Sequence, residues 1–238
     1  MLEGPLIVRD AIRAGLSISD VFVRADDPEL AELARECRAA GAAVLEVGES
    51  VLRSVSDTTT PQGVVAVAAA PAHSLADLLD EADLVLVLDQ VRDPGNAGTM
   101  IRSAAAAGVD CIVFTTGSVD PFSPKTVRAS AGSAFKVPVD RGLEAPEAAA
   151  ALRAAGFTLV AGSGTARTEI FQVDLTGKVA IVVGNEAWGF EGSPDDVADV
   201  TAAIPMESDV ESLNVAVAAS ILLFEVVRQR RLSSARHG

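Results

Sequence analysis

Short apolar runs alternate with alanine-rich or polar segments through most of the chain. The runs 84–89, 111–116, 157–162 and 179–184 are almost entirely apolar, as expected of strands buried on both faces. A further run at 202–206 completes the series. Helical segments separate these runs, and strands that alternate with helices form mostly parallel sheets covered on both faces. The pattern therefore predicts an α/β fold with a doubly wound, mostly parallel sheet.

The first seventy residues have a pattern of their own. A helical pattern around residues 29–40 precedes two apolar strands, at 43–47 and 64–70, with a polar turn between them. Proline and polar residues then interrupt the periodicity before a new helix begins at Leu75. We therefore expect a small α/β domain in front of the larger one. The expected divisions are a domain at 1–70, a linker at 71–76 and a domain at 77–238.

Composition excludes several classes of protein. With 49% hydrophobic residues the chain of 238 residues is globular. No apolar run reaches the roughly 18 residues of a membrane span, and the first ten residues lack a basic signal region, so we expect a cytoplasmic protein with no membrane partner. The two cysteines, Cys37 and Cys111, and the two histidines, His73 and His237, lack metal-site spacing. We expect reduced thiols and no metal.

Charge is unevenly distributed along the chain. The net charge of −14 argues against non-specific binding to nucleic acid, which depends on phosphate neutralisation by Lys and Arg. Residues 92–136 nevertheless hold five bases against three acids. Residues 191–211 hold seven acids and no base, which is typical of a solvated surface. The basic window is the more informative feature, because it overlaps a candidate ligand loop.

That loop follows the buried run 84–89, where a strand meets an alanine-rich helix that stops at Gly108. Asn96 can cap the helix, and Gly98 lets a ligand approach the backbone. Ligands of doubly wound sheets bind beyond the carboxyl ends of the strands, so the loops after the apolar runs are the candidate sites. The chain has neither a G-x-G-x-x-G fingerprint nor a P-loop. In the closing helix, Ser212 is the expected N-cap.

Three ordered motifs give these loops a specific resemblance. They are N-x-G-x-x-x-R at 96–102, G-N-E-x-x-G at 184–189, and I-P-M at 204–206 followed by S-L-N-V at 212–215. Together they resemble the SpoU/TrmH family of SPOUT-class RNA ribose 2′-O-methyltransferases, which use S-adenosylmethionine. Residues 121–139 are similar to a segment of its ribosomal-RNA members, and residues 3–69 resemble its small substrate-binding domain. The resemblance implies a C-terminal trefoil knot and a homodimer formed through the C-terminal domain.

The resemblance also implies roles for individual residues. The catalytic candidates are Asn96, Arg102, Glu186, Ser212 and Asn214. The cofactor-binding candidates are Gly184, Ile204, Met206 and Leu213. A guanidinium stays protonated at neutral pH, which favours Arg102 as a group that orients the 2′-hydroxyl and stabilises alkoxide charge; the family view makes it the general base, and both roles stay open. Lys125 and Arg128 are candidate phosphate contacts in RNA.

The leading hypothesis is an S-adenosylmethionine-dependent 2′-O-ribose methyltransferase that acts on ribosomal RNA, with 23S RNA as the expected target. A transfer-RNA 2′-O-methyltransferase is the first alternative, and the front domain and the 121–139 segment count against it. A catalytically inactive RNA-binding or ribosome-assembly protein of the same fold is the second. The acidic net charge favours that alternative, whereas the intact motif residues count against it.

Overall fold

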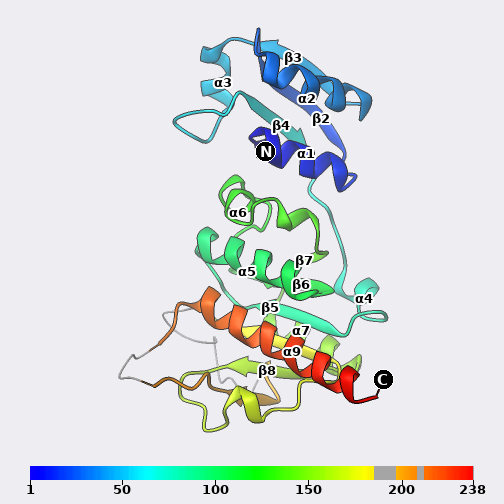
Figure 1. Cartoon of the computed structure of the whole chain (residues 1–238), viewed down its shortest axis with the longest axis vertical. Coiled ribbons are helices and arrows are strands. Elements are labelled where there is room, and N and C mark those ends of the chain that lie inside the picture. Colours follow the sequence, from blue (N-terminus) through cyan, green and yellow to red (C-terminus); the bar gives the residue numbers. More distant parts are fainter. Residues whose placement is uncertain (185–196, 208–211, 238) are drawn as a thin grey trace.

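The computed structural model describes residues 1–184, 197–207 and 212–237, and these form two β-sheets. The N-terminal sheet has the strand order β1-β4-β2-β3 and is mixed, because β2 pairs parallel with β3 and antiparallel with β4 (Figure 1). Its strands are β1 (Leu2–Glu3), β2 (Ile18–Arg24), β3 (Ala43–Val47) and β4 (Val64–Ala68). Its helices are α1 (Pro5–Arg13), α2 (Pro28–Ala39) and α3 (Glu49–Val55).

The second sheet has six strands in the order β10-β8-β9-β5-β6-β7, and every neighbouring pair is parallel. The predicted α/β fold with a mostly parallel sheet is confirmed. The strands are β5 (Leu84–Leu88), β6 (Cys111–Thr115), β7 (Val139–Leu143), β8 (Thr158–Gly162), β9 (Val179–Val183) and β10 (Val200–Ala202). The helices are α4 (Leu75–Leu78), α5 (Pro94–Ala107), α6 (Pro124–Ala129), α7 (Ala145–Ala154) and α9 (Val215–His237), with 3-10 turns η1 (Ser133–Phe135) and η2 (Ile170–Gln172).

Helices cover both faces of the six-stranded sheet. Side chains alternate across a strand, so Leu84, Leu86 and Leu88 of β5 join one apolar cluster while Val85 and Val87 join another. The first cluster includes α5 and α9, and the second includes α4 and α7. All five residues of β5 are buried, which explains why the strand is apolar without alternation.

Helix α5 begins earlier than predicted, and this changes the interpretation of two residues. Its N-cap is Asp93, whose carboxylate accepts a hydrogen bond of 2.7 Å from the backbone N–H of Asn96. Asn96 therefore lies inside the first turn and is not the cap. At the other end Gly108 adopts φ 73°, the left-handed conformation of a glycine C-cap, as predicted.

The prediction for Gly98 was also wrong. A Cβ at this position would lie 2.7 Å from the carbonyl carbon of Ala129 and 2.8 Å from the nitrogen of Ser130. The space above Gly98 is filled by α6, so the glycine permits two helices to pack closely and leaves no approach for a ligand.

The sequence pattern misplaced one strand and did not predict two others. The run 202–206 was predicted as a strand, but β10 ends at Ala202. Pro205 lies within the predicted run, and proline has no N–H to donate to a strand ladder. β2 and β7 were not predicted, because polar residues interrupt both strands.

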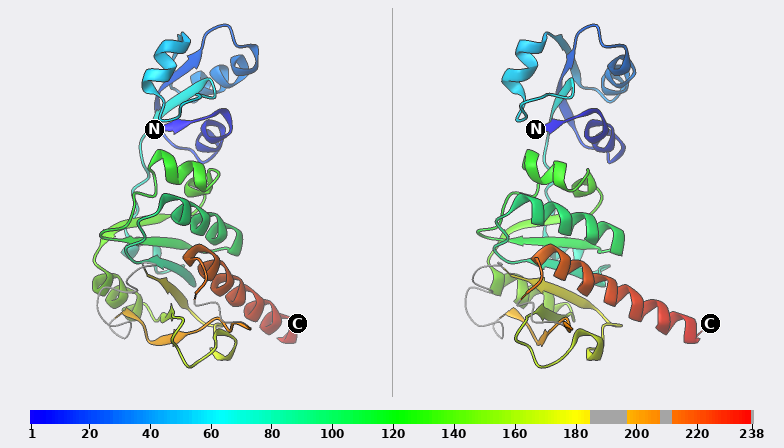
Figure 2. Two further views of the ribbon diagram at one scale, coloured as in Figure 1. Left: turned by 90° about the vertical axis from the view of Figure 1, so that its left-hand side faces the viewer. Right: turned by 60° about the vertical axis from the view of Figure 1, so that its left-hand side comes forward.

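The linking segment 69–74 contains neither helix nor strand. Figures 1 and 2 show α6 between the N-terminal domain and α5, so it is the part of the larger domain that faces the smaller one. Among the helices of the described ranges, none is long and apolar enough to cross a membrane.

Candidate functional site

A pocket of about 320 Å³ lies beyond the carboxyl ends of β8, β9 and β10, against the start of α9. This volume is within the range of small-molecule sites. The pocket is lined by residues from four separate segments. They are Gly162, Ser163 and Gly164 after β8; Val183 and Gly184 at the end of β9; Ala202, Ile204 and Met206 from β10 onward; and Ser212, Leu213, Asn214, Val215, Ala218 and Leu222 at α9.

The structure thus brings together all four residues predicted to bind a cofactor, Gly184, Ile204, Met206 and Leu213, and two predicted catalytic residues, Ser212 and Asn214. Parallel strands explain the gathering, because their carboxyl ends meet at one edge of the sheet. Met206 and Leu213 are 37% and 36% exposed, so the apolar wall of the pocket is open to an incoming molecule.

Asn214 connects this pocket to helix α5. Its Oδ1 accepts hydrogen bonds from the backbone N–H groups of Ala216 (2.9 Å) and Val217 (3.3 Å), which fixes the orientation of the amide. Its Nδ2 then donates a 2.9 Å hydrogen bond to Oδ1 of Asn96. The two predicted catalytic asparagines therefore touch each other, although 118 positions separate them in the sequence.

Asn214 is consequently the N-cap of α9, and the prediction that Ser212 caps it was wrong. α9 begins at Val215, so Ser212 lies before the capping position. Ser212 is exposed and lines the pocket instead. A second contact, 2.7 Å between Ser103 Oγ and Ser220 Oγ, also joins α5 to α9.

The remaining predicted catalytic residues are not part of this cluster as described. Arg102 is an exposed residue of α5, and the described lining of the pocket does not include it. Glu186, with Asn185 and Gly189 of the same motif, lies outside the described residues.

The two candidate RNA contacts lie on α6 and differ in their surroundings. Lys125 is exposed, whereas Arg128 is partly buried and forms ion pairs with Glu3 and Asp57 of the N-terminal domain. A contact between either residue and RNA stays a prediction.

Sequence reasoning missed one feature of the site and one buried carboxylate that lies outside the described lining of the pocket. Gly162, Ser163 and Gly164 line the pocket, and the signal was present because they follow a buried strand of the same sheet. Asp89 is 3% exposed at the end of β5 and accepts a 2.8 Å hydrogen bond from Thr115 Oγ1. Asp89 is the last residue of the apolar run 84–89, so it was counted as part of the predicted strand. Within the described ranges no group of three or more His, Cys, Asp or Glu could hold a metal ion.

Two protein families match the chain, one for each sheet. Residues 83–224 match the SpoU rRNA Methylase family, and residues 1–74 match the family described as RNA 2′-O ribose methyltransferase substrate binding. The chain belongs to the SpoU rRNA methylase family. The SpoU match includes α5, the pocket and the first part of α9.

Relatives of this SpoU protein span most of its length. The 23S rRNA (guanosine-2′-O-)-methyltransferase RlmB of Xylella fastidiosa is 37% identical over 224 residues, which cover 90% of each chain. The 23S rRNA (guanosine(2553)-2′-O)-methyltransferase RlmP of Bacillus subtilis is 32% identical over 95% of this chain and 87% of its own. The crystal structure of an AdoMet-bound rRNA methyltransferase from Sinorhizobium meliloti superposes with a TM-score of 0.85 at 35% identity, covering 95% of this chain and 85% of that chain.

Proposed function

We propose that this protein transfers the methyl group of S-adenosylmethionine to a ribose 2′-oxygen of 23S ribosomal RNA, at a guanosine. The observation that supports this most directly is the pocket built from the family motifs at the carboxyl edge of the sheet. Full-length relatives named as 23S rRNA guanosine 2′-O-methyltransferases support the substrate. In this proposal residues 1–70 bind RNA, residues 71–76 link the domains, and residues 77–238 perform methyl transfer in the cytoplasm, where ribosomal RNA is found.

The residues of the pocket fit S-adenosylmethionine. Three glycines among the lining residues expose backbone N–H and C=O groups that can bond polar edges of a ligand. Ile204, Leu213 and Leu222 supply apolar surface for a flat ring. When bound, S-adenosylmethionine supplies an electrophilic methyl group on a sulfonium. Gly184, Ile204, Met206 and Leu213 would hold it in this pocket.

The chain itself must bring a 2′-hydroxyl into line with that methyl group. The Asn96–Asn214 pair fixes polar groups beside the pocket, and Ser212 adds a hydroxyl that can bond the ribose. Arg102 presents a guanidinium that can bond a 2′-oxygen or a neighbouring phosphate and stabilise negative charge on the oxygen. We assign Glu186 to the same catalytic group on the basis of its motif, and Lys125 to RNA phosphate contact.

The test is methyl transfer from labelled S-adenosylmethionine to unmodified 23S, 16S and transfer RNA, supplied separately and then digested to nucleosides. We expect 2′-O-methylguanosine from 23S RNA. Label on transfer RNA alone would support the first alternative enzyme. No label on any RNA, from protein that binds the cofactor, would favour a binding or assembly protein. An Arg102→Ala variant with wild-type rate would refute the role of Arg102.

We further propose that the chain ends in a trefoil knot. The strand order β10-β8-β9 and the convergence of residues 184, 204 and 212–214 on one pocket are consistent with a chain that passes through its own loop. A crystal structure traced continuously from β9 to α9 tests this proposal, and a path that can be pulled straight would refute it.

We also propose a homodimer formed through α9. The helix leaves Val217, Phe224 and Leu232 between 47% and 49% exposed, and spacings of seven and eight residues place them on one face. Phe224→Asp should convert the dimer into a monomer in sedimentation equilibrium. A monomeric wild type, or a dimeric variant, would contradict the assignment.

A dimer would also account for the position of Arg102, which is exposed and outside the described lining of its own pocket. We propose that one protomer's Arg102 serves the pocket of its partner. Mixed dimers test this: one protomer carries Arg102→Ala, and the other carries Gly184→Trp, which fills its pocket. Restored activity supports a composite site, because one intact pocket then faces one intact arginine. Activity no higher than that of either parent would refute it.

A further inference from the structure

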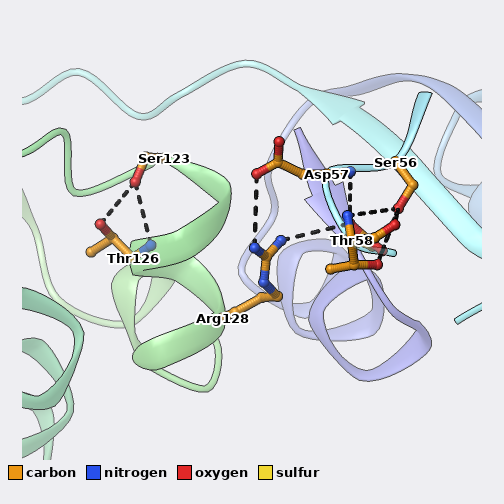
Figure 3. A network of polar contacts seen from close by, with 7 residues as sticks. Ser56, Asp57, Thr58, Ser123, Thr126 and Arg128 are labelled. Carbon is orange, nitrogen blue, oxygen red and sulfur yellow. Dashed lines mark hydrogen bonds and ion pairs between the residues drawn. The ribbon is translucent and has the colours of Figure 1, made fainter. Parts of the chain in front are cut away.

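The segment 128–132 has the sequence RASAG and belongs to the stretch that resembles ribosomal-RNA members of the family. In the structure this segment faces the N-terminal domain. Helix α6, which contains Arg128, packs against both β1 and α5. Figure 3 shows the Arg128 side chain extending from α6 toward the loop that contains Ser56, Asp57 and Thr58. The segment therefore contacts the other domain.

Arg128 makes two ionic contacts across this boundary. Its Nη1 lies 3.6 Å from Oε2 of Glu3, and its Nη2 lies 3.8 Å from Oδ2 of Asp57. The side chain of Glu3 is 5% exposed, and that of Asp57 is 45% exposed. Nη1 is buried and has no hydrogen-bond acceptor among the described residues, so the charge of Glu3 is what compensates its burial.

Glu3 is held in its charged form. Burial raises the pKa of its carboxyl group, but hydrogen bonds from Ser56, Thr58 and the backbone N–H of Asp57, together with the charge of Arg128, lower it by more. The hydroxyl of Ser56 donates at 2.6 Å and that of Thr58 also donates to the same oxygen. The N-terminal domain thus presents a fixed anion to α6.

A second contact lies at the end of the same segment. Gly132 has φ 75°, and a Cβ there would lie 2.7 Å from Oδ2 of Asp10 in α1. The chain after α6 therefore lies directly against the Asp10 side chain of α1. The apolar cluster is also continuous between the two domains.

The segment is in turn fixed to the catalytic pocket. Gly98 lets α6 pack directly on α5, and α5 holds Asn96, which bonds Asn214 at the pocket. A continuous series of packed groups therefore joins Glu3 to the pocket. Residues 69–74, between β4 and α4, have no helix or strand of their own to set the angle between the domains.

We propose that Arg128 is a positioning residue, which fixes the N-terminal domain on α6 so that RNA bound by that domain meets the pocket in one orientation. The effect on methylation rests on the proposed function, whereas the domain contact does not. Loss of the contact lowers the effective concentration of bound RNA at the pocket, so Arg128→Ala should raise KM for RNA by about tenfold with kcat nearly unchanged.

The experiment measures the distance between domains in the full protein without RNA. Cysteines are introduced at two exposed alanines, Ala39 in α2 and Ala150 in α7, and are labelled as a fluorescence donor and acceptor pair. The natural Cys37 and Cys111 are fully buried and stay unlabelled. The matched control is Lys125→Ala, which removes the same charge from an exposed position of the same helix.

We expect a broader distribution of distances for Arg128→Ala, a smaller broadening for the exposed Asp57→Ala, and the wild-type distribution for Lys125→Ala. Arg128→Lys, which keeps the charge, should recover most of the wild-type distribution. If Arg128→Ala leaves the distribution unchanged, the positioning role is refuted, and a raised KM would then identify Arg128 as a direct RNA contact. Because the distances are measured without substrate, they decide the domain contact even if no RNA is methylated.

Discussion

Replacement of Asn214 tests the link between helix capping and the site. The side chain has two separable functions, since Oδ1 caps α9 and Nδ2 donates to Asn96. Loss of an asparagine N-cap costs about 1 kcal/mol, and loss of one hydrogen bond costs about 1 kcal/mol. Asn214→Ala should therefore lower the free energy of unfolding by about 2 kcal/mol. Asn214→Ser keeps a capping oxygen but lacks the amide donor, so it should lose about 1 kcal/mol.

The assay is urea unfolding followed by circular dichroism, at one protein concentration so that association does not change between variants. A double-mutant cycle with Asn96→Ala isolates the asparagine pair, and methylation rates of the same variants measure its effect on the site. Asn214→Ala and Asn214→Ser should both lose activity, because each lacks the amide that donates to Asn96. An Asn214→Ala protein within about 0.5 kcal/mol of wild type would refute the capping role. Equal losses for alanine and serine would refute the division into two functions.

Three further predictions concern packing, pH and thiol chemistry. Gly98→Ala should lower the melting temperature, because the overpacking cost of about 1–3 kcal/mol exceeds the gain of about 1 kcal/mol in helix propensity. The control is Gly164→Ala, which should not lower the melting temperature, because the space at its Cβ position is open. Glu3 has a lowered folded-state pKa, so its stabilisation is present above the unfolded value of about 4.3 and is lost as pH falls through the folded value. Urea titrations should therefore show Glu3→Gln less stable than wild type at pH 7, with the difference shrinking in acid. Burial raises the pKa of Cys111 to about 12 and also raises that of Cys37, so neither thiol should react with a disulfide reagent at pH 8 until the protein is unfolded.

The larger sheet was predictable because each central strand is buried on both faces. Such strands are continuous apolar runs, and the positions of β5, β6, β8 and β9 along the chain follow directly from them. β7 could not be found in this way. It contains Asp140, Arg141 and Gly142, and it is the last strand at one edge of the sheet. Edge strands tolerate polar residues and therefore give a weak apolar signal.

The capping residues show a different limit. Several polar residues precede each helix, and sequence alone does not tell which of them meets the first free N–H groups. Asn96 was predicted to cap α5 and Ser212 to cap α9, whereas the caps in the structure are Asp93 and Asn214. The structure decides: Asp93 accepts from the backbone N–H of Asn96, and Asn214 accepts from those of Ala216 and Val217. The pocket, by contrast, was predictable in outline, because its residues follow the ends of parallel strands.

The distribution of ion pairs indicates where an acidic protein can attract RNA. Five of the six arginines in residues 1–70 pair with carboxylates of their own domain, which leaves little positive charge there to neutralise phosphates. On and around α5 and α6, however, several exposed bases form no ion pair with a described residue. These are Arg92, Arg102, Lys125 and Lys136. The unpaired positive charge therefore belongs mainly to the larger domain, on and around α5 and α6. Under the proposed function, the N-terminal domain would bind RNA mainly through shape and neutral contacts. Such contacts act only at short range and in one orientation, so the proposed positioning role of Arg128 would serve this kind of recognition.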